Sequence, residues 1–333
     1  MVVVQKHHEA LLVSDEEGGS PVAQAFRRLR QCQADCAHPG KRLGDLYRRK
    51  PAHDEHCARL GIRLESGTGQ IRLRSLLTME LFDSLVDDET LVRQAETPVA
   101  AVVASHCELR NAYPDLLASL VVPDTRLTEV ARRVPPSASV PLSVITSAGA
   151  GGLLALSRHK SASVEIASVE PALRDLDDLA GSAARVISAA GGLEPEVAVF
   201  IELPYAPGWE SAVGLIEAAG LAGKIAVGQA EPRQVVEQLS ILIEADLPFK
   251  ITSPLAEDWL ALLSTVDALV DGASLEEATE LLRLADRDRV RTAVAGWDPP
   301  TQSRVRRRVR RLGTPRVRDV ITALTGYGPR PES

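Results

Sequence analysis

Two charged residues stand inside apolar runs that have the composition of buried strands. Lys250 lies in "PFKITSP", residues 248–254, and Glu202 lies in "VFIELP", residues 199–204. An unpaired charge is costly to bury, so each residue requires a counter-charge or a polar cavity. A desolvated lysine with a lowered pKa can attack a carbonyl and form a Schiff base, and a nearby glutamate can shuttle protons. We therefore take Lys250 and Glu202 as candidate catalytic residues.

The residues around them leave three roles open for this pair. Side chains alternate along a strand, so Lys250 and Thr252 share one face and Ile251 points to the other. If the charged faces point inward, Glu202 meets Lys250 directly or together with Lys224. The pair then forms an internal salt bridge that fixes packing, holds an anionic or carbonyl-containing ligand, or performs lyase or aldolase chemistry through Lys250.

The elements that position these residues alternate between short apolar strands and longer amphipathic helices. About six strands are expected between residues 117 and 254, and "SLLTMELFDSLV", residues 75–86, is expected to be a helix. Helical connections imply parallel strands with right-handed crossovers. The pattern favours a TIM-barrel-like α/β domain, closed or incomplete, and the alternative is a doubly wound open parallel sheet.

In both folds the functional residues lie at the carboxyl ends of the strands. This rule selects polar residues that end or follow the predicted strands. Lys224 is the exception, because it follows Gly223 at the start of a strand and is alternatively a solvated residue at the opposite end. The predicted ligand-binding residues are Thr146, Glu170, Lys224, Gly228, Gln229, Thr252 and Ser253.

A second group of candidate residues lies near the amino terminus. Cys32 and Cys36 are four residues apart, and so are His53 and Cys57. Residues four apart share one face of a helix, and thiolate and imidazole ligands suit a tetrahedral zinc ion. The spacing is unlike the common zinc knuckles, and the alternative is surface histidine with buried free cysteine.

Length and composition indicate a chain of 333 residues, 45% hydrophobic, that can bury a large core. Three segments are expected: a flexible amino terminus (1–19), a small helical extension (20–75) and the barrel-like domain (76–333) with a basic tail. Four cysteines do not make a disulfide scaffold in a chain of this length, and neither a signal peptide nor a membrane span is visible. These features predict a cytoplasmic protein.

Charge is unevenly distributed along a chain whose net charge is −7. Residues 1–75 and 300–333 are basic, and the segment between them is acidic. Charges of opposite sign within one chain can simply attract each other. The alternatives are phosphate or nucleic-acid binding and a protein partner bound through the basic segments. The arginine run in "QSRVRRRVRRLGTPRVR" has no interleaved aromatic residues, so nucleic-acid binding is not expected.

From about residue 80 to 325 the chain resembles a family of uncharacterised bacterial proteins. The similar segments are "LVDDETLVRQAETPVAAVVASH", "SLVVPDTRL", "VFIELP", "AGKIAVG", "DLPFKITSPL" and "RRLGTPRV". The resemblance implies a TIM-barrel-like fold and no defined activity. The family carries Phe-Pro-Pro, Thr-Gly-Gly and Thr-Ala-Gly-Leu-His-His motifs; this chain has Val92-Arg93-Gln94, Val227-Gly228-Gln229 and residues 252–257 there.

These departures favour a small-molecule-binding barrel derived from an enzyme scaffold. Glu202, Lys224 and Lys250 keep the family's residues, whereas the histidine pair is absent. Whether the chain is itself an enzyme stays open at this point. The alternatives are a Lys250-dependent enzyme and a non-catalytic interaction scaffold.

Overall fold

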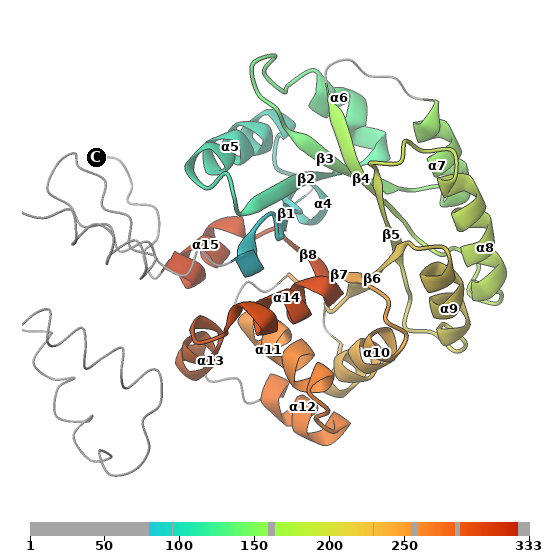
Figure 1. Ribbon diagram of the computed structural model, residues 1–333. Helices are drawn as coiled ribbons and strands as arrows, with labels where there is room; N and C mark the ends of the chain where they lie inside the picture. The colour runs from blue at the N-terminus through green and yellow to red at the C-terminus, as the bar shows by residue number, and fades with distance from the viewer. Residues whose placement is uncertain are drawn as a thin grey trace, which may run out of the picture. The chain divides into compact units, whose positions relative to one another are not determined.

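The computed structural model describes residues 80–94, 96–158, 164–228, 230–254, 259–283 and 287–325. Eight parallel strands form a closed barrel in chain order, and β1 pairs with β8 to complete it. Figure 1 shows the helices arranged around this barrel. The TIM-barrel-like fold expected from the alternation of strands and helices is confirmed, and closure excludes an open sheet.

The strands are short, and most are separated by one helix or more. They are β1 (Val86–Asp88), β2 (Leu117–Pro123), β3 (Pro141–Thr146), β4 (Glu165–Pro171), β5 (Ala198–Glu202), β6 (Ala222–Ala226), β7 (Phe249–Thr252) and β8 (Val309–Thr314). The helices are η2 (Glu80–Phe82), α4 (Thr90–Arg93), α5 (Val99–Ala112), η3 (Asp124–Arg126), α6 (Leu127–Ala131), α7 (Ala150–Ser157), α8 (Leu179–Ala190), α9 (Glu210–Ala218), α10 (Pro232–Glu244), α11 (Trp259–Val270), α12 (Leu275–Arg283), α13 (Arg287–Ala295), α14 (Pro299–Arg308) and α15 (Val317–Thr325).

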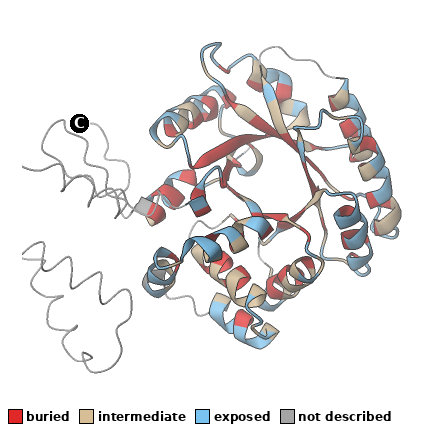
Figure 2. Ribbon diagram, viewed as in Figure 1, coloured by how far each residue is buried: buried red, intermediate tan, exposed pale blue. Residues whose placement is uncertain are grey.

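Burial follows the two layers of the fold. Figure 2 shows the strands largely buried and the helices exposed on their outer sides. The helix α10 illustrates the local cause: Pro232 opens it, and Glu231 and Gln234 form a capping box. Its apolar face, including Val235 and Leu239, is buried against the barrel layer. Amphipathic helices of this kind supply the outer half of the core.

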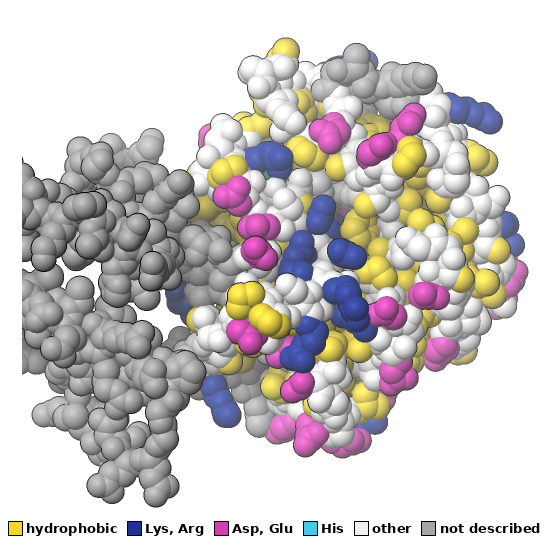
Figure 3. Space-filling view, in the orientation of Figure 1, with side chains coloured by type: hydrophobic (Ala, Val, Ile, Leu, Met, Phe, Trp, Pro, Cys, Tyr) yellow, Lys and Arg dark blue, Asp and Glu magenta, His cyan; other side chains and the backbone are white. Residues whose placement is uncertain are grey.

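The arginine-rich segment near the end of the chain forms α14 and β8 and thus belongs to the barrel. Arg304 pairs with Asp267 and Asp271, and Arg308 pairs with Asp246. Figure 3 shows basic side chains gathered over the middle of the barrel in this view, with acidic side chains around them. The basic tail that the sequence suggested is therefore partly an integral strand with intramolecular ion pairs.

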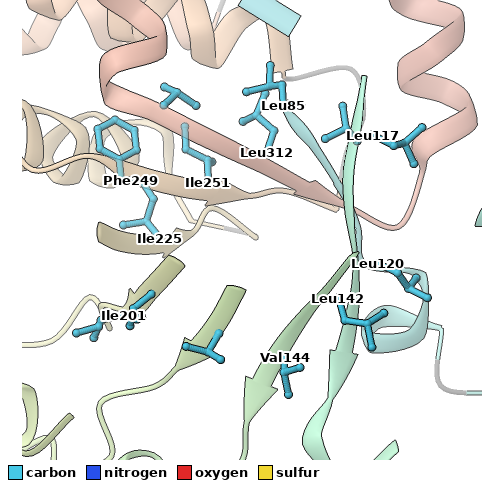
Figure 4. Packing of buried hydrophobic residues seen from close by; sticks show 14 of the residues in the cluster. Leu85, Leu117, Leu120, Leu142, Val144, Ile201, Ile225, Phe249, Ile251 and Leu312 are labelled. Carbon is cyan, nitrogen blue, oxygen red and sulfur yellow. The ribbon is translucent and has the colours of Figure 1, made fainter. Parts of the chain in front are cut away.

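The apolar core lies between the barrel and the helices. Figure 4 shows Leu120, Leu142, Ile201, Ile225 and Ile251 among the residues of this cluster. Each is fully buried on its strand, and burial of such side chains contributes about 1.5–3 kcal/mol apiece. Because one strand face is committed to this core, the alternate residues must point into the barrel.

The beginning of the barrel differs from the sequence-based expectation. Residues 75–86 were expected to be one helix; residues 75–79 lie outside the described part of the chain, and from residue 80 onward η2 spans Glu80–Phe82 and β1 starts at Val86. Ser84 has a φ of 47°, a conformation that ends the helical turn. The short strand follows immediately, so the two acidic residues after Val86 lie at the barrel wall.

No helix within the described ranges has the length and apolar character that crossing a membrane requires.

Candidate functional site in the barrel interior

The strand register brings charged residues together on the inner face of the barrel. Lys224 lies opposite Glu202 on one side and Lys250 on the other. Lys250 in turn lies opposite Arg311 of β8. Four neighbouring strands, β5 to β8, therefore each carry one ionisable residue in register with that of the next strand.

Lys250 lies at the centre of an ion-pair network and is fully buried. Its Nζ is 2.8 Å from Asp87 Oδ2 and 2.8 Å from Glu170 Oε1. Glu89 Oε1 is 3.7 Å away. The ammonium group thus has carboxylates on two sides, and a ligand must displace one of them to reach it.

Lys224 and Glu170 connect this centre to the carboxyl-terminal end of the barrel. Lys224 Nζ lies 2.8 Å from Glu170 Oε2 and 2.9 Å from Glu202 Oε2. Glu170 bridges the two lysines, one on each carboxylate oxygen. Glu202 and Lys250 are therefore connected by a chain of ion pairs that runs through Lys224 and Glu170.

The electrostatic consequence is that both lysines remain protonated. Burial alone favours the neutral amine, but the carboxylates of Asp87, Glu170 and Glu89 outweigh it and raise the pKa of Lys250. Burial is likewise outweighed at Lys224, where Glu170 and Glu202 raise the pKa. A Schiff-base nucleophile needs a lowered pKa. This environment raises the pKa of both lysines, whereas the lyase interpretation requires a lowered lysine pKa.

The carboxylates respond in opposite directions according to their partners. Burial opposes ionisation of Glu170, but Lys224 and Lys250 outweigh it and hold the pKa of this carboxyl well below its ordinary value. At Glu89 burial is the dominant influence, and it raises the pKa despite the attraction of Lys250. The interior therefore holds one firmly ionised carboxylate and one that retains its proton more readily.

Small hydroxyl side chains complete the hydrogen bonding of the carboxylates. Ser119 Oγ donates to Asp87 Oδ1 at 2.6 Å, and Ser143 Oγ donates to Glu170 Oε1 at 2.5 Å. Ser168 Oγ donates to Ser143 Oγ at 2.7 Å. Buried charges are tolerated when ion pairs and hydrogen bonds satisfy them, and this network meets that condition around Asp87 and Glu170.

Asp87 and Glu89 are central to the network but were not among the predicted site residues. Both follow residues 75–86, which were expected to be a helix, so no strand end was expected at this point of the chain. Gly313 of β8 lies opposite Asp87. A Cβ atom at Gly313 would collide with Glu89 Oε1, so the glycine leaves the space that the Glu89 carboxyl occupies.

The other predicted ligand-binding residues are divided between the interior, the outer layer and the loops. Thr252 Oγ1 donates to Glu89 Oε1 at 3.0 Å, so Thr252 belongs to the network. Ser253 is buried, and its backbone N–H donates to the Gly313 carbonyl. Thr146 packs against Gly152 of α7, which places it on the outer side of β3. Gly228 has a φ of 47° in the exposed turn after β6.

Several predicted residues lie outside the described part of the chain. They are the four zinc candidates Cys32, Cys36, His53 and Cys57, together with Gln229. Within the described residues no group of three or more His, Cys, Asp or Glu side chains is arranged to hold a metal ion. The zinc hypothesis thus stays a prediction from sequence.

Exposure distinguishes Glu202 from the rest of the network. The side chains of Asp87, Glu89, Glu170 and Lys250 are at most 1% exposed, whereas that of Glu202 is 37% exposed. Ala172 forms a bridge to Glu202. Ala226 lies two residues beyond Lys224, on the same strand face, and is exposed. Glu202 therefore stands at the solvent-facing rim of the barrel, beside small side chains.

A second hollow lies outside the barrel interior. It is a shallow, open pocket of about 350 Å³ between η3, α6 and α7. Asp124 Oδ2 in its lining already accepts hydrogen bonds from the backbone N–H and the hydroxyl of Ser147. This carboxylate oxygen is thus occupied by a neighbouring loop.

No family model, curated protein or solved structure matches the chain in the comparisons made with known proteins. The resemblance to an uncharacterised bacterial family therefore stays a prediction from sequence.

Proposed function

We propose that the barrel binds a small polar molecule at its carboxyl-terminal mouth and that Glu202 is the group that contacts it. The observation that carries this proposal is the contrast in exposure within one ion-pair network. Glu202 is 37% exposed although it is bound to a lysine that is only 4% exposed. Closed parallel barrels place their ligand sites at this end.

The charges of the interior favour a ligand that carries an ammonium group or hydroxyl donors. Lys224 and Lys250 face four carboxylates, those of Asp87, Glu89, Glu170 and Glu202. An incoming anion would meet lysines that are already neutralised and a carboxylate at the rim. A hydrogen-bond donor, in contrast, finds an accessible acceptor in Glu202. The ligand class thus differs from the anionic or carbonyl-containing molecule that Lys250 suggested.

The role assigned to Lys224 is to orient Glu202, and Glu170 in turn positions Lys224. Lys224 contacts both carboxylates within 2.9 Å and is itself nearly buried. A fixed, charged acceptor binds a donor more tightly than a mobile one because less freedom is lost on binding. This proposal concerns binding; a covalent role for Lys250 is not part of it, since that amine is held protonated.

A thermal-shift panel tests the proposal with small amines and polyols against carboxylates and phosphates of similar size. We expect amines or polyols to raise the melting temperature of the wild type in a saturable manner. Replacement of Glu202 by Gln should weaken that binding about tenfold or more, since a charged hydrogen bond is lost. The matched control is Glu217→Gln on the exposed side of α9. Equal binding by E202Q, or stabilisation by the anions alone, would reject the proposal.

A further inference from the structure

Ile145 is a partly exposed apolar residue whose side chain points into the barrel. Its neighbour Thr146 packs outward against Gly152 of α7, whereas Ser143, two residues earlier, donates to Glu170 in the interior. Side chains alternate along a strand, so Ile145 shares the inner face with Ser143. Among the described residues, Ile145 is not part of the apolar cluster between the barrel and the helices. It therefore ends the inner face of β3 with part of its surface in solvent.

The strand register places further apolar side chains beside Ile145 at the carboxyl-terminal mouth. Pro123 of β2 lies opposite Ile145, and Ile145 lies opposite Glu170 of β4. Two residues beyond Glu170, and on the same strand face, Ala172 forms the bridge to Glu202 of β5. Pro123 and Ala172 are partly exposed, as Ile145 is. These three residues, which we call the apolar wall, thus lead along the inner face of the barrel to Glu202.

The mouth therefore combines an exposed carboxylate with apolar surface. An exposed apolar side chain is ordinary by itself, but here three lie in neighbouring strands beside one charged acceptor. A polyol laid along this wall would lose water from its hydroxyl groups without gaining acceptors there. An ammonium group on a hydrocarbon chain fits both parts, because the ammonium donates to Glu202 and the chain removes apolar surface from water.

We propose that the ligand of the mouth is a primary amine with a short apolar chain, held by Glu202 at the ammonium group and by the apolar wall along the chain. The inference rests on the proposed binding function of Glu202 and adds the class of ligand to it. Neighbouring strands are about 4.8 Å apart, so Ile145, two strands from Glu202, lies about 10 Å away along the wall. A linear chain of about four to six carbon atoms covers that span.

The experiment titrates the full chain with linear primary amines, from methylamine to hexylamine, and follows binding by calorimetry. Each added methylene group that reaches the wall should tighten binding about twofold to fourfold, because it leaves water for an apolar contact. Hexanol has the same hydrocarbon chain without the charge. It should bind at least about tenfold more weakly than hexylamine, because it lacks the charged hydrogen bond to Glu202.

Three variants assign the two halves of the ligand to their contacts. Ile145→Ala should weaken hexylamine binding about fivefold and leave methylamine binding within about twofold, since only the longer chain reaches the wall. Glu202→Gln should weaken binding of every amine about tenfold, whatever its chain length. Leu215→Ala shortens an exposed apolar side chain on α9, outside the barrel. It is the matched control and should leave hexylamine binding unchanged.

The outcomes separate this inference from the function on which it rests. Affinities that are independent of chain length, with binding still weakened in E202Q, would overturn the apolar wall and leave the function of Glu202 standing. A gain with chain length that I145A does not reduce would also reject the wall. If neither amines nor polyols bind, the proposed function itself fails and this inference with it. The chain-length series is measured on the wild type, so it decides the matter even where I145A does not fold.

Discussion

At the scale of single residues, the barrel depends on a lysine that the sequence presents as an anomaly. Lys250 is fully buried within a strand, and its ammonium group lies between carboxylates from β1 and β4. The alternatives considered for it were a structural salt bridge, a ligand contact and a nucleophile. Its burial and its raised pKa favour the structural role, in which one cation offsets the cost of burying two carboxylates.

Replacing Lys250 by Met should strongly destabilise the protein. The change leaves Asp87 and Glu170 without one of their cations, and breaking a buried ion pair costs about 3–5 kcal/mol. Urea unfolding at neutral pH measures this loss. Arg233→Met, at an exposed ion pair on α10, should cost no more than about 1 kcal/mol. A smaller loss for K250M than for R233M would contradict the structural role.

Stability should fall with acid because of Glu170. Its pKa in the folded protein is depressed below the ordinary value of 4.5, since the two lysines outweigh the effect of burial. The resulting stabilisation is present above about pH 4.5 and is lost as the pH falls further, by at most about 1.4 kcal/mol per pH unit. Glu170→Gln should therefore flatten the acid side of the stability profile, measured by urea unfolding from pH 6 to pH 3.

Glu89→Gln provides the opposite comparison in the same barrel. The pKa of Glu89 is raised, so this residue favours the folded state more as the pH falls. Its replacement should make the acid side steeper than in the wild type. Parallel profiles for E170Q and E89Q would contradict the assignment of opposite shifts.

At the scale of elements, β8 and β1 are adapted to each other through a missing side chain. Gly313 lies opposite Asp87 across the closing strand pair, and the Glu89 carboxyl fills the space beside it. Lys250 Cε would lie 3.1 Å from a Cβ atom at this glycine. Gly313 thus belongs to the strand pair that closes the barrel and also lies against the buried charged network.

Gly313→Ala should destabilise the protein by about 1–3 kcal/mol through overpacking. In the Glu89→Ala background the added methyl group has space. Gly313→Ala should therefore cost less there than in the wild type, and a double-mutant cycle measures the difference. Gly214→Ala in α9 is the control, because nothing lies within 4 Å of the added Cβ. There alanine should stabilise the helix by about 0.5–1 kcal/mol. Additive costs at Gly313 and Glu89 would show that they do not interact.

At the scale of the whole molecule, the segment after residue 298 completes the barrel. It contributes β8, which pairs with both β7 and β1, and the flanking helices α14 and α15. Without it two strand edges are left unpaired, and unpaired edges favour aggregation over folding.

A chain ending at residue 298 should therefore lose its cooperative unfolding transition, as measured by calorimetry. Arg310→Gln in the intact chain should stay within about 0.5 kcal/mol of wild-type stability, because it is an exposed substitution. The comparison separates loss of the strand from loss of an arginine. A cooperative transition in the truncated chain would show that β8 is dispensable.

Prediction from sequence succeeded where local patterns were regular. The six strands from β2 to β7 were expected because apolar runs such as those around Ile201 and Ile251 alternate with helical periodicity. The two closing strands were missed: β1 has only three residues, and β8 carries arginines that resemble a solvated charge run. Short or charged strands are stabilised by their neighbours more than by their own composition.

By itself the sequence determined the fold class and singled out Glu202 and Lys250 as charges that require an explanation. Their apolar surroundings are encoded locally, within a few residues of each. The tertiary structure decided the partners: Lys250 contacts Asp87, 163 positions away, and Glu170, 80 positions away. It also decided that Glu202 reaches the solvent. Ion pairs and exposure depend on which strands close the barrel, and that closure brings together residues no local pattern connects.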